Sequence, residues 1–226
     1  MSNNKSNNFP KGVVFDMDGL MFNTEWVVKY SWDMAGKDMG YESFGDNIYN
    51  TLGMNKAARK EYFLEKYGEN FDFDGFTEIY REYCLSYLKE KGTPIKPGLF
   101  ELLEYLKSEG IPMVVATSSN EEFAMSKLKE TGCLKYFKRV ICGNMVTKSK
   151  PDPQIYNIAR KELGMDASDV LALEDAPNGI RAALAAGINV IMIPDLLENA
   201  PSELEGKLTA KLEDLNKVVE FIKKHK

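Results

Sequence analysis

Two aspartates separated by one residue follow a short apolar run near the N-terminus, where Val13, Val14 and Phe15 lead into Asp16 and Asp18. Alternate residues of an extended chain lie on one side, so both carboxylates can face the space beyond a strand's end. In open α/β sheets, ligands bind at the carboxyl ends of the strands. Two like charges held close repel unless a cation or a proton intervenes. The pair therefore predicts a metal site, an acid–base role, or both.

Polar side chains also follow the apolar run at residues 113–116. The hydroxyls of Thr117 and Ser118 could bind a phosphate oxygen, and the following helix start would offer N–H groups to an anion. Ser119 or Asn120 would serve equally well as the N-cap of that helix, so by itself this stretch leaves both interpretations open.

A lysine lies in a proline-stiffened approach to another expected helix. Lys150 precedes Pro151, Asp152 and Pro153, which make a good N-cap and helix start. An ammonium group is a compact charge that can neutralise a phosphate. The alternative for Lys150 taken alone is an ordinary solvated loop lysine.

Two adjacent carboxylates, Glu174 and Asp175, follow the apolar run at residues 170–173. Charge at the end of a buried strand is costly without a counter-ion, although a helix start could use one of the two. Carboxylate oxygens suit Mg²⁺, which typically takes one or two of them together with waters and phosphate oxygens.

The elements that must position these residues are five strand-like runs, at 13–15, 113–116, 139–142, 170–173 and 189–193. The runs are continuous rather than alternating, as in strands buried on both faces of a parallel sheet. Residues 99–106 between them show helical spacing, and Gly110 follows as a cap. This alternation predicts an α/β fold with a doubly wound parallel-sheet, Rossmann-like core.

The interval between the first two runs is far longer than the roughly 30 residues of a βαβ unit. It contains a helical stripe at residues 76–88 and no strand-like run. We therefore expect residues 1–20 and 94–226 to form the catalytic core, with a disordered tail at 1–8. Residues 21–93 would be an inserted α-helical cap that returns through the Pro/Gly-rich linker 92–98 and acts as a lid.

Composition and charge exclude several classes of function. The chain has 226 residues, 44% of them hydrophobic, and a net charge of -5, which argues against nucleic acid as a partner. No apolar run approaches the roughly 20 residues of a membrane helix, and the polar start lacks a signal-peptide core. Three cysteines without a CxxC pair indicate a reducing, cytoplasmic location. The single histidine, His225, lies next to the C-terminus, which excludes mechanisms that need a His base or ligand.

Taken together, four stretches resemble the haloacid dehalogenase-like hydrolases, in the β-phosphoglucomutase-like and sugar-phosphate phosphatase branch with an α-helical cap. The motifs are residues 15–20 (FDMDGL), 116–120 (ATSSN), 150–153 (KPDP) and 173–179 (LEDAPNG). The resemblance covers nearly the whole chain beyond the first ten residues.

The resemblance implies roles for the acidic residues. Asp16 would be the nucleophile that forms an aspartyl-phosphate, and Asp18 the general acid and base. Mg²⁺ would be bound by three groups: the Asp16 carboxylate, the Asp18 backbone carbonyl and the Asp175 carboxylate. Glu174 would be a direct or an outer ligand.

The resemblance also implies a substrate site. Thr117, Ser118 and Lys150 would hold the phosphate, and Asn23 and Lys56 would contact the substrate from the cap. Specificity would depend on cap residues, namely Asn23, Trp26, Asn55, Lys56 and Arg59.

Two departures favour hydrolysis over the mutase chemistry of the same branch. Val28 stands where the mutases have a histidine, and Lys56 in the stretch 53–56 stands where they have an arginine. We expect a monomeric phosphatase acting on a small phosphorylated metabolite, with a sugar phosphate preferred. The alternatives are a phosphomutase of the β-phosphoglucomutase type and a non-catalytic sugar-phosphate-binding protein. The intact pair of Asp16 and Asp18 argues against the latter, and the expected Mg²⁺ site argues against dehalogenation.

Overall fold

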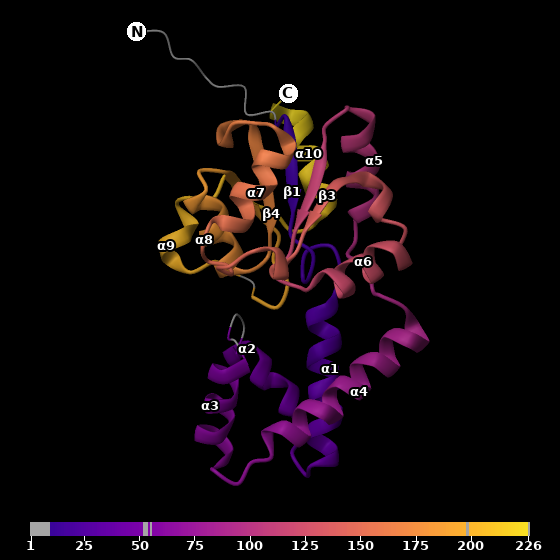
Figure 1. The fold of residues 1–226 in the computed structure, drawn as a ribbon, viewed down its shortest axis with the longest axis vertical. Coiled ribbons are helices and arrows are strands. Elements are labelled where there is room, and N and C mark those ends of the chain that lie inside the picture. The colour runs from indigo at the N-terminus through magenta and orange to yellow at the C-terminus, as the bar shows by residue number, and fades with distance from the viewer. Residues whose placement is uncertain (1–9, 52–53, 55, 198, 226) are drawn as a thin grey trace. The chain divides into compact units, whose positions relative to one another are not determined.

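The computed structural model describes residues 10–51, 54, 56–197 and 199–225 (Figure 1). The tail expected at residues 1–8 and the cap positions Gly53 and Asn55 lie outside these residues. The chain divides into two compact units, Met1–Phe22 with Ile95–Lys226, and Asn23–Pro94.

The larger unit contains a six-stranded, fully parallel sheet in the order β3-β2-β1-β4-β5-β6. This arrangement confirms the predicted fold class. The short edge strand β6 was not predicted, because two residues carry no hydrophobic pattern. The strands are β1 (Gly12–Phe15), β2 (Met113–Ala116), β3 (Phe137–Ile141), β4 (Val170–Glu174), β5 (Asn189–Met192) and β6 (Ala210–Lys211).

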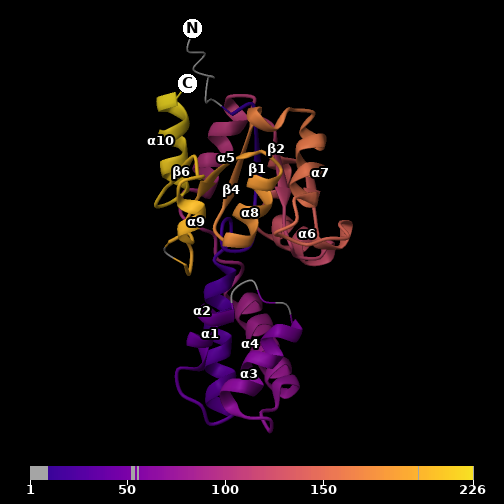
Figure 2. The same cartoon turned by 90° about the vertical axis from the view of Figure 1, so that its left-hand side faces the viewer.

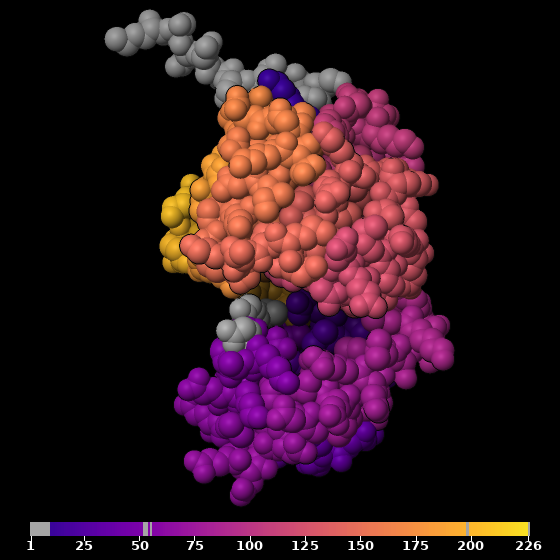
Figure 3. Space-filling view, viewed as in Figure 1, coloured from indigo at the N-terminus to yellow at the C-terminus, as the bar shows by residue number. Residues whose placement is uncertain are grey.

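Helices cover both faces of this sheet (Figures 1 and 2). The inner strands β1, β2 and β4 are buried on both sides, because alternate residues enter two separate cores: Val13 and Phe15 enter one, and Val14 the other. One face carries α5 (Leu99–Ser108), α6 (Glu121–Glu130) and α10 (Leu215–His225), and the other carries α7 (Gln154–Leu163), α8 (Pro177–Ala185) and α9 (Ser202–Glu205). In the space-filling view the orange segment that includes α7 forms a large part of the visible face of this unit (Figure 3).

Short 3₁₀ turns complete the larger unit at η2 (Leu134–Tyr136), η3 (Gly143–Met145) and η4 (Ala167–Asp169). Among the residues with a described position, no helix combines the length and apolar character needed to cross a membrane.

The smaller unit is helical and has its own aromatic core. Trp32 is fully buried and makes edge contacts with Phe63 and Phe76, and Phe44 stacks on Phe63 with ring centroids 5.2 Å apart. Aromatic rings bury large areas, so a small unit of this kind can hold together. Its elements are α1 (Thr24–Asp38), η1 (Phe44–Asn47), α2 (Ile48–Thr51), α3 (Lys56–Tyr67) and α4 (Phe73–Lys91).

Candidate active site

Asp16 extends the β1 ladder by one residue beyond the strand. Its N–H donates to the Leu173 carbonyl of β4 at 3.0 Å. Because strand residues alternate, the Asp16 side chain lies on the face of Val14, which α7 and α8 cover. Only 10% of this side chain is exposed, so an ionised Asp16 requires a partner.

Lys150 provides that partner, from the loop between β3 and α7. Its Nζ lies 2.5 Å from Asp16 Oδ1 and 2.7 Å from Glu174 Oε1, and it donates to the Ala116 carbonyl at 3.0 Å. One ammonium group therefore joins the ends of β1, β2 and β4, and each of its three N–H donors has an acceptor. This placement favours the functional interpretation of Lys150 over a solvated loop lysine.

Glu174, the last residue of β4, is directed toward Lys150 by its surroundings. Its Oε1 also accepts a hydrogen bond from Tyr156 of α7 at 2.5 Å. Its carboxylate lies on the backbone of Gly179, where a Cβ would be only 1.8 Å from Oε1. The first turn of α8 can approach β4 this closely because Gly179 lacks a side chain.

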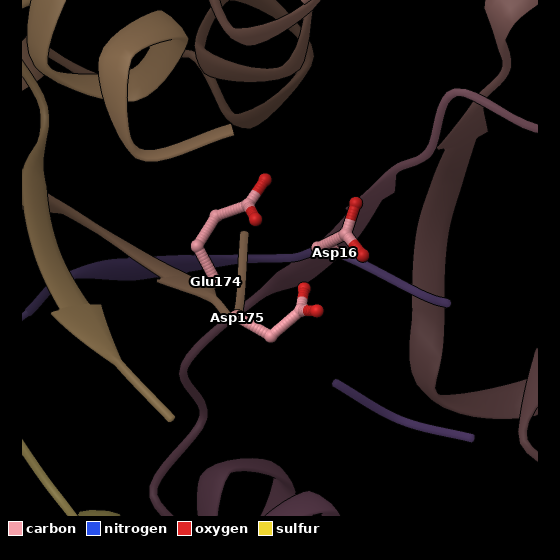
Figure 4. A group of neighbouring side chains, drawn as sticks. All are labelled: Asp16, Glu174 and Asp175. Atoms are coloured by element: carbon pink, nitrogen blue, oxygen red, sulfur yellow. The ribbon is translucent and has the colours of Figure 1, made fainter. Parts of the chain in front are cut away.

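Three carboxylates converge at this edge of the sheet (Figure 4). One oxygen from each of Asp16, Glu174 and Asp175 lies within 4.8 Å of the others, and all three residues are buried. Buried carboxylates this close are costly unless a cation lies between them, and an all-oxygen donor set is the type that Mg²⁺ prefers. The described residues of this group therefore fit a Mg²⁺ ion.

The protonation equilibria of this group are strongly perturbed. Burial raises the pKa of Asp16 to about 8, Lys150 opposes this shift, and Glu174 and Asp18 add to it. Burial works against the charge of Lys150, but Asp16 and Glu174 outweigh it and raise the pKa of the ammonium group. Burial, together with the negative charge of Glu174, raises the pKa of the Tyr156 hydroxyl, so Tyr156 acts as a donor.

Asp18 is less buried than Asp16 and is held by hydroxyls at the end of β2. Its Oδ2 accepts from Ser119 Oγ at 2.7 Å and from Thr117 Oγ1 at 3.4 Å. Thr117 Oγ1 in turn accepts from the Ser119 N–H at 3.0 Å. Asn120 caps α6 by accepting from the Phe123 N–H at 2.9 Å, which leaves Ser119 available for Asp18.

The remaining expected site residues are not part of this buried group. Ser118 is exposed at the end of β2. Asn23 and Lys56 belong to the smaller unit, where Asn23 precedes α1 and its N–H donates to the Pro94 carbonyl at 2.8 Å. Lys56 begins α3, and its Nζ lies 3.5 Å from Asp74 Oδ1. The structure therefore gathers six of the expected residues at the strand ends, namely Asp16, Asp18, Thr117, Lys150, Glu174 and Asp175.

Two residues of this site were not predicted from the sequence. Ser119 was considered only as a helix cap, and its contact with Asp18 spans 101 positions of the chain. Tyr156 lies inside an amphipathic helix, where an aromatic residue has the ordinary pattern of a core position. Neither contact leaves a local signal, because both depend on how distant segments pack.

Comparison with known proteins connects this geometry to a family. The model of the family described as haloacid dehalogenase-like hydrolase matches residues 13–193. A phosphorylated carbohydrates phosphatase from Thermotoga maritima is 30% identical over 186 residues, covering 80% of this chain and 83% of that protein.

Solved structures have the same architecture. A candidate β-phosphoglucomutase from Thermotoga maritima is 25% identical with a TM-score of 0.78, over 94% of this chain and 98% of that one. A HAD family hydrolase from Deinococcus radiodurans, with bound phosphate and sodium, matches in fold with a TM-score of 0.83 at 18% identity, over 96% and 97% of the two chains. The chain belongs to the haloacid dehalogenase-like hydrolases and is a phosphatase.

Proposed function

We propose that this protein is a Mg²⁺-dependent phosphomonoester hydrolase that works through an aspartyl-phosphate on Asp16. The observation that carries the proposal is the buried group of Asp16, Lys150 and Glu174, with Asp175 beside it at the ends of β1 and β4. A fold would avoid so many buried charges unless they serve chemistry, which makes the site a candidate for nucleophilic attack by a carboxylate.

In the first half-reaction, an Asp16 carboxylate oxygen forms a bond to the substrate phosphorus as the bond to the ester oxygen breaks. Asp18 in its protonated form gives its proton to the leaving oxygen, so the alcohol departs neutral. The hydroxyls of Ser119 and Thr117 hold Asp18 at the end of β2. A fixed Asp18 can therefore meet the leaving group without reorientation.

In the second half-reaction, Asp18 takes a proton from water. The water oxygen attacks phosphorus, the bond to Asp16 breaks, and free phosphate and the original carboxylate are restored. Lys150 holds Asp16 in place throughout, and its charge acts on the phosphoryl oxygens through proximity. Thr117 and Ser118 are the further phosphate-binding residues we propose.

A Mg²⁺ ion held by Asp16, the carbonyl of Asp18 and Asp175 would supply the positive charge that lets a carboxylate approach a phosphate dianion. The arrangement also suggests a division of labour between the adjacent carboxylates. Glu174 engages Lys150 and Tyr156, so we assign Asp175 the direct contact with the ion and Glu174 the orienting role.

For the substrate we propose a small phosphorylated metabolite, with sugar phosphates first, because the Thermotoga maritima relative is a phosphatase of phosphorylated carbohydrates. Asn23 and Lys56 remain the proposed substrate contacts from residues 23–94. Hydrolysis is favoured over the mutase reaction, since Val28 in α1 cannot handle a proton as the mutase histidine does.

The test compares Asp16→Asn with the wild type in a phosphate-release screen over sugar, nucleotide and glycolytic phosphates, with Mg²⁺ or with EDTA. Losing the nucleophile should lower Mg²⁺-dependent release by at least about 10³-fold. Asp169→Asn is the matched control, because Asp169 pairs with Lys11 at the opposite end of the sheet. Retained release in Asp16→Asn would overturn the mechanism, and conversion of a sugar 1-phosphate faster than phosphate release would favour the mutase.

A further inference from the structure

A second buried ion pair in the larger unit has no part in the mechanism above. Lys96 Nζ contacts Asp195 Oδ1, and only 15% and 7% of the two side chains are exposed. Outside the Lys150 group, no other ion pair among the described residues has both partners so deeply buried. Burying two charges is unfavourable before their attraction is counted, so a fold retains such a pair where it has a role.

The pair connects β5 to the turn that follows Asp18. Asp195 lies just beyond β5, at the same edge of the sheet as Asp16 and Asp175. The Lys96 N–H donates to the Met21 carbonyl at 3.0 Å, and Ile95 bridges Phe22. Lys96 is therefore fixed by its own backbone to the segment that carries Asp18.

Asp195 offers a carboxylate oxygen to the same turn. Its Oδ2 is buried and accepts no hydrogen bond from a residue that the structure describes. A Cβ placed on Gly19 would lie 3.3 Å from this oxygen and 2.2 Å from Asp175 Oδ2. Gly19 has φ +87°, a conformation suited to glycine, and the two carboxylates lie against its backbone.

We propose that Asp195, held by Lys96, is a positioning residue of the metal site. Its Oδ2 accepts a hydrogen bond from a water on the ion that Asp16 and Asp175 bind. Mg²⁺ keeps several of its waters in protein sites, and outer carboxylates that orient such ligands strongly affect metal affinity. Asp195 acts through water because it does not belong to the group whose oxygens approach within 4.8 Å, namely Asp16, Glu174 and Asp175. This inference rests on the proposed function in one respect, because both require that the protein binds a Mg²⁺ ion at this site.

The decisive variant is Asp195→Asn. Its side-chain oxygen can still accept from Lys96, while an N–H₂ group, which donates instead of accepting, replaces Oδ2. We expect the Mg²⁺ concentration for half-maximal phosphate release to rise about tenfold, with kcat at saturating Mg²⁺ within about twofold of wild type. A second measurement needs no substrate: the Mg²⁺ concentration required to raise the Tm should also be about tenfold higher in Asp195→Asn than in the wild type.

Glu203→Gln is the matched control, since Glu203 pairs with Arg181 on an exposed surface between α8 and α9. A role confined to stability would lower the Tm of Asp195→Asn and leave its Mg²⁺ dependence at the wild-type value, which would overturn the proposal. If Asp195→Asn does not fold, the double variant Lys96→Gln/Asp195→Asn removes both charges and is held to the same criterion. A wild-type protein that shows no response to Mg²⁺ would overturn the proposed function as well, which distinguishes the two failures.

Discussion

At the scale of single residues, this site holds several charged side chains in a buried environment. Three carboxylates lie together, those of Asp16, Glu174 and Asp175. Lys150 contacts Asp16 and Glu174 and supplies one positive charge. The remaining negative charge is available for a dication and a phosphoryl group. The site is therefore costly to the metal-free protein and becomes favourable when its ligands bind.

This cost predicts a pH dependence of stability in the metal-free protein. Burial raises the pKa of Asp16 from 3.8 to about 8. Between those values the unfolded chain has released this proton and the folded protein has kept it. The free energy of unfolding should therefore fall as pH rises through this window. Urea titrations of the wild type in EDTA at pH 5, 6.5 and 8 measure the slope.

Asp16→Asn is the control for that slope, because an amide has no proton to release and the variant should show a flatter profile. Adding Mg²⁺ should stabilise the wild type more at pH 8 than at pH 5, since the ion needs the ionised carboxylate. Equal slopes in the wild type and Asp16→Asn would show that another group is responsible. Lys150, whose pKa is raised above 10.5, does not titrate in this window.

At the scale of elements, the parallel sheet brings the site together and the helices on one face refine it. β1 and β4 are neighbours, so the side chains that follow them meet without any special loop. Helix α7 then adds Tyr156, and the first turn of α8 packs Gly179 against Glu174. The direction of Glu174 is thus set by two helices that are distant in the chain from Asp16.

Gly179→Ala tests the role of α8. The new methyl group would lie 1.8 Å from Glu174 Oε1, so the carboxylate or the helix must move. We expect a loss of about 1 to 3 kcal/mol in the free energy of unfolding. We also expect at least about a tenfold fall in kcat, because Lys150 loses its fixed partner. Thermal unfolding and phosphate release measure the two effects.

Gly206→Ala is the matched control, since, apart from its chain neighbours, no described residue has an atom within 4 Å of the added Cβ at the end of α9. This change should leave activity unchanged and be neutral or slightly stabilising. A Gly179→Ala protein with wild-type stability and activity would show that Glu174 can move without cost, contrary to the role given to α8.

At the scale of the whole molecule, two compact units share one chain, which leaves the larger unit and returns to it at neighbouring points. Phe22 forms a bridge with Ile95, and the Asn23 N–H donates to the Pro94 carbonyl at 2.8 Å. The larger unit keeps both of its hydrophobic cores within residues 10–22 and 95–225. Adjacent exit and return points are what insertion of one domain into another requires.

Replacing residues 23–94 by a short Gly/Ser linker tests this independence. Since the ends to be joined already lie side by side, closing the loop should cost little, and the larger unit should unfold in a single cooperative transition. Circular dichroism and a thermal scan would show whether mixed helix and strand content survives. The isolated 23–94 segment, examined in the same way, reports on the aromatic core of the smaller unit. A molten or aggregated larger unit would contradict the prediction.

The sequence by itself determined the class of fold and the edge of the sheet where chemistry occurs. Continuous apolar runs predict buried parallel strands, and Asp16, Thr117 and Glu174 follow three of them directly. Such placement is local, because the carboxyl end of a strand is set by the residues that compose it. The four motifs at residues 15–20, 116–120, 150–153 and 173–179 also predicted the family.

The tertiary structure decided which of these residues touch each other. Lys150 pairs with Asp16 across 134 positions, Ser119 rather than Asn120 reaches Asp18, and Lys96 meets Asp195 across 99 positions. No local spacing encodes such contacts, since each depends on how loops and helices pack after the sheet has formed. The sequence thus places charged groups at one edge, and packing assigns each group its partner.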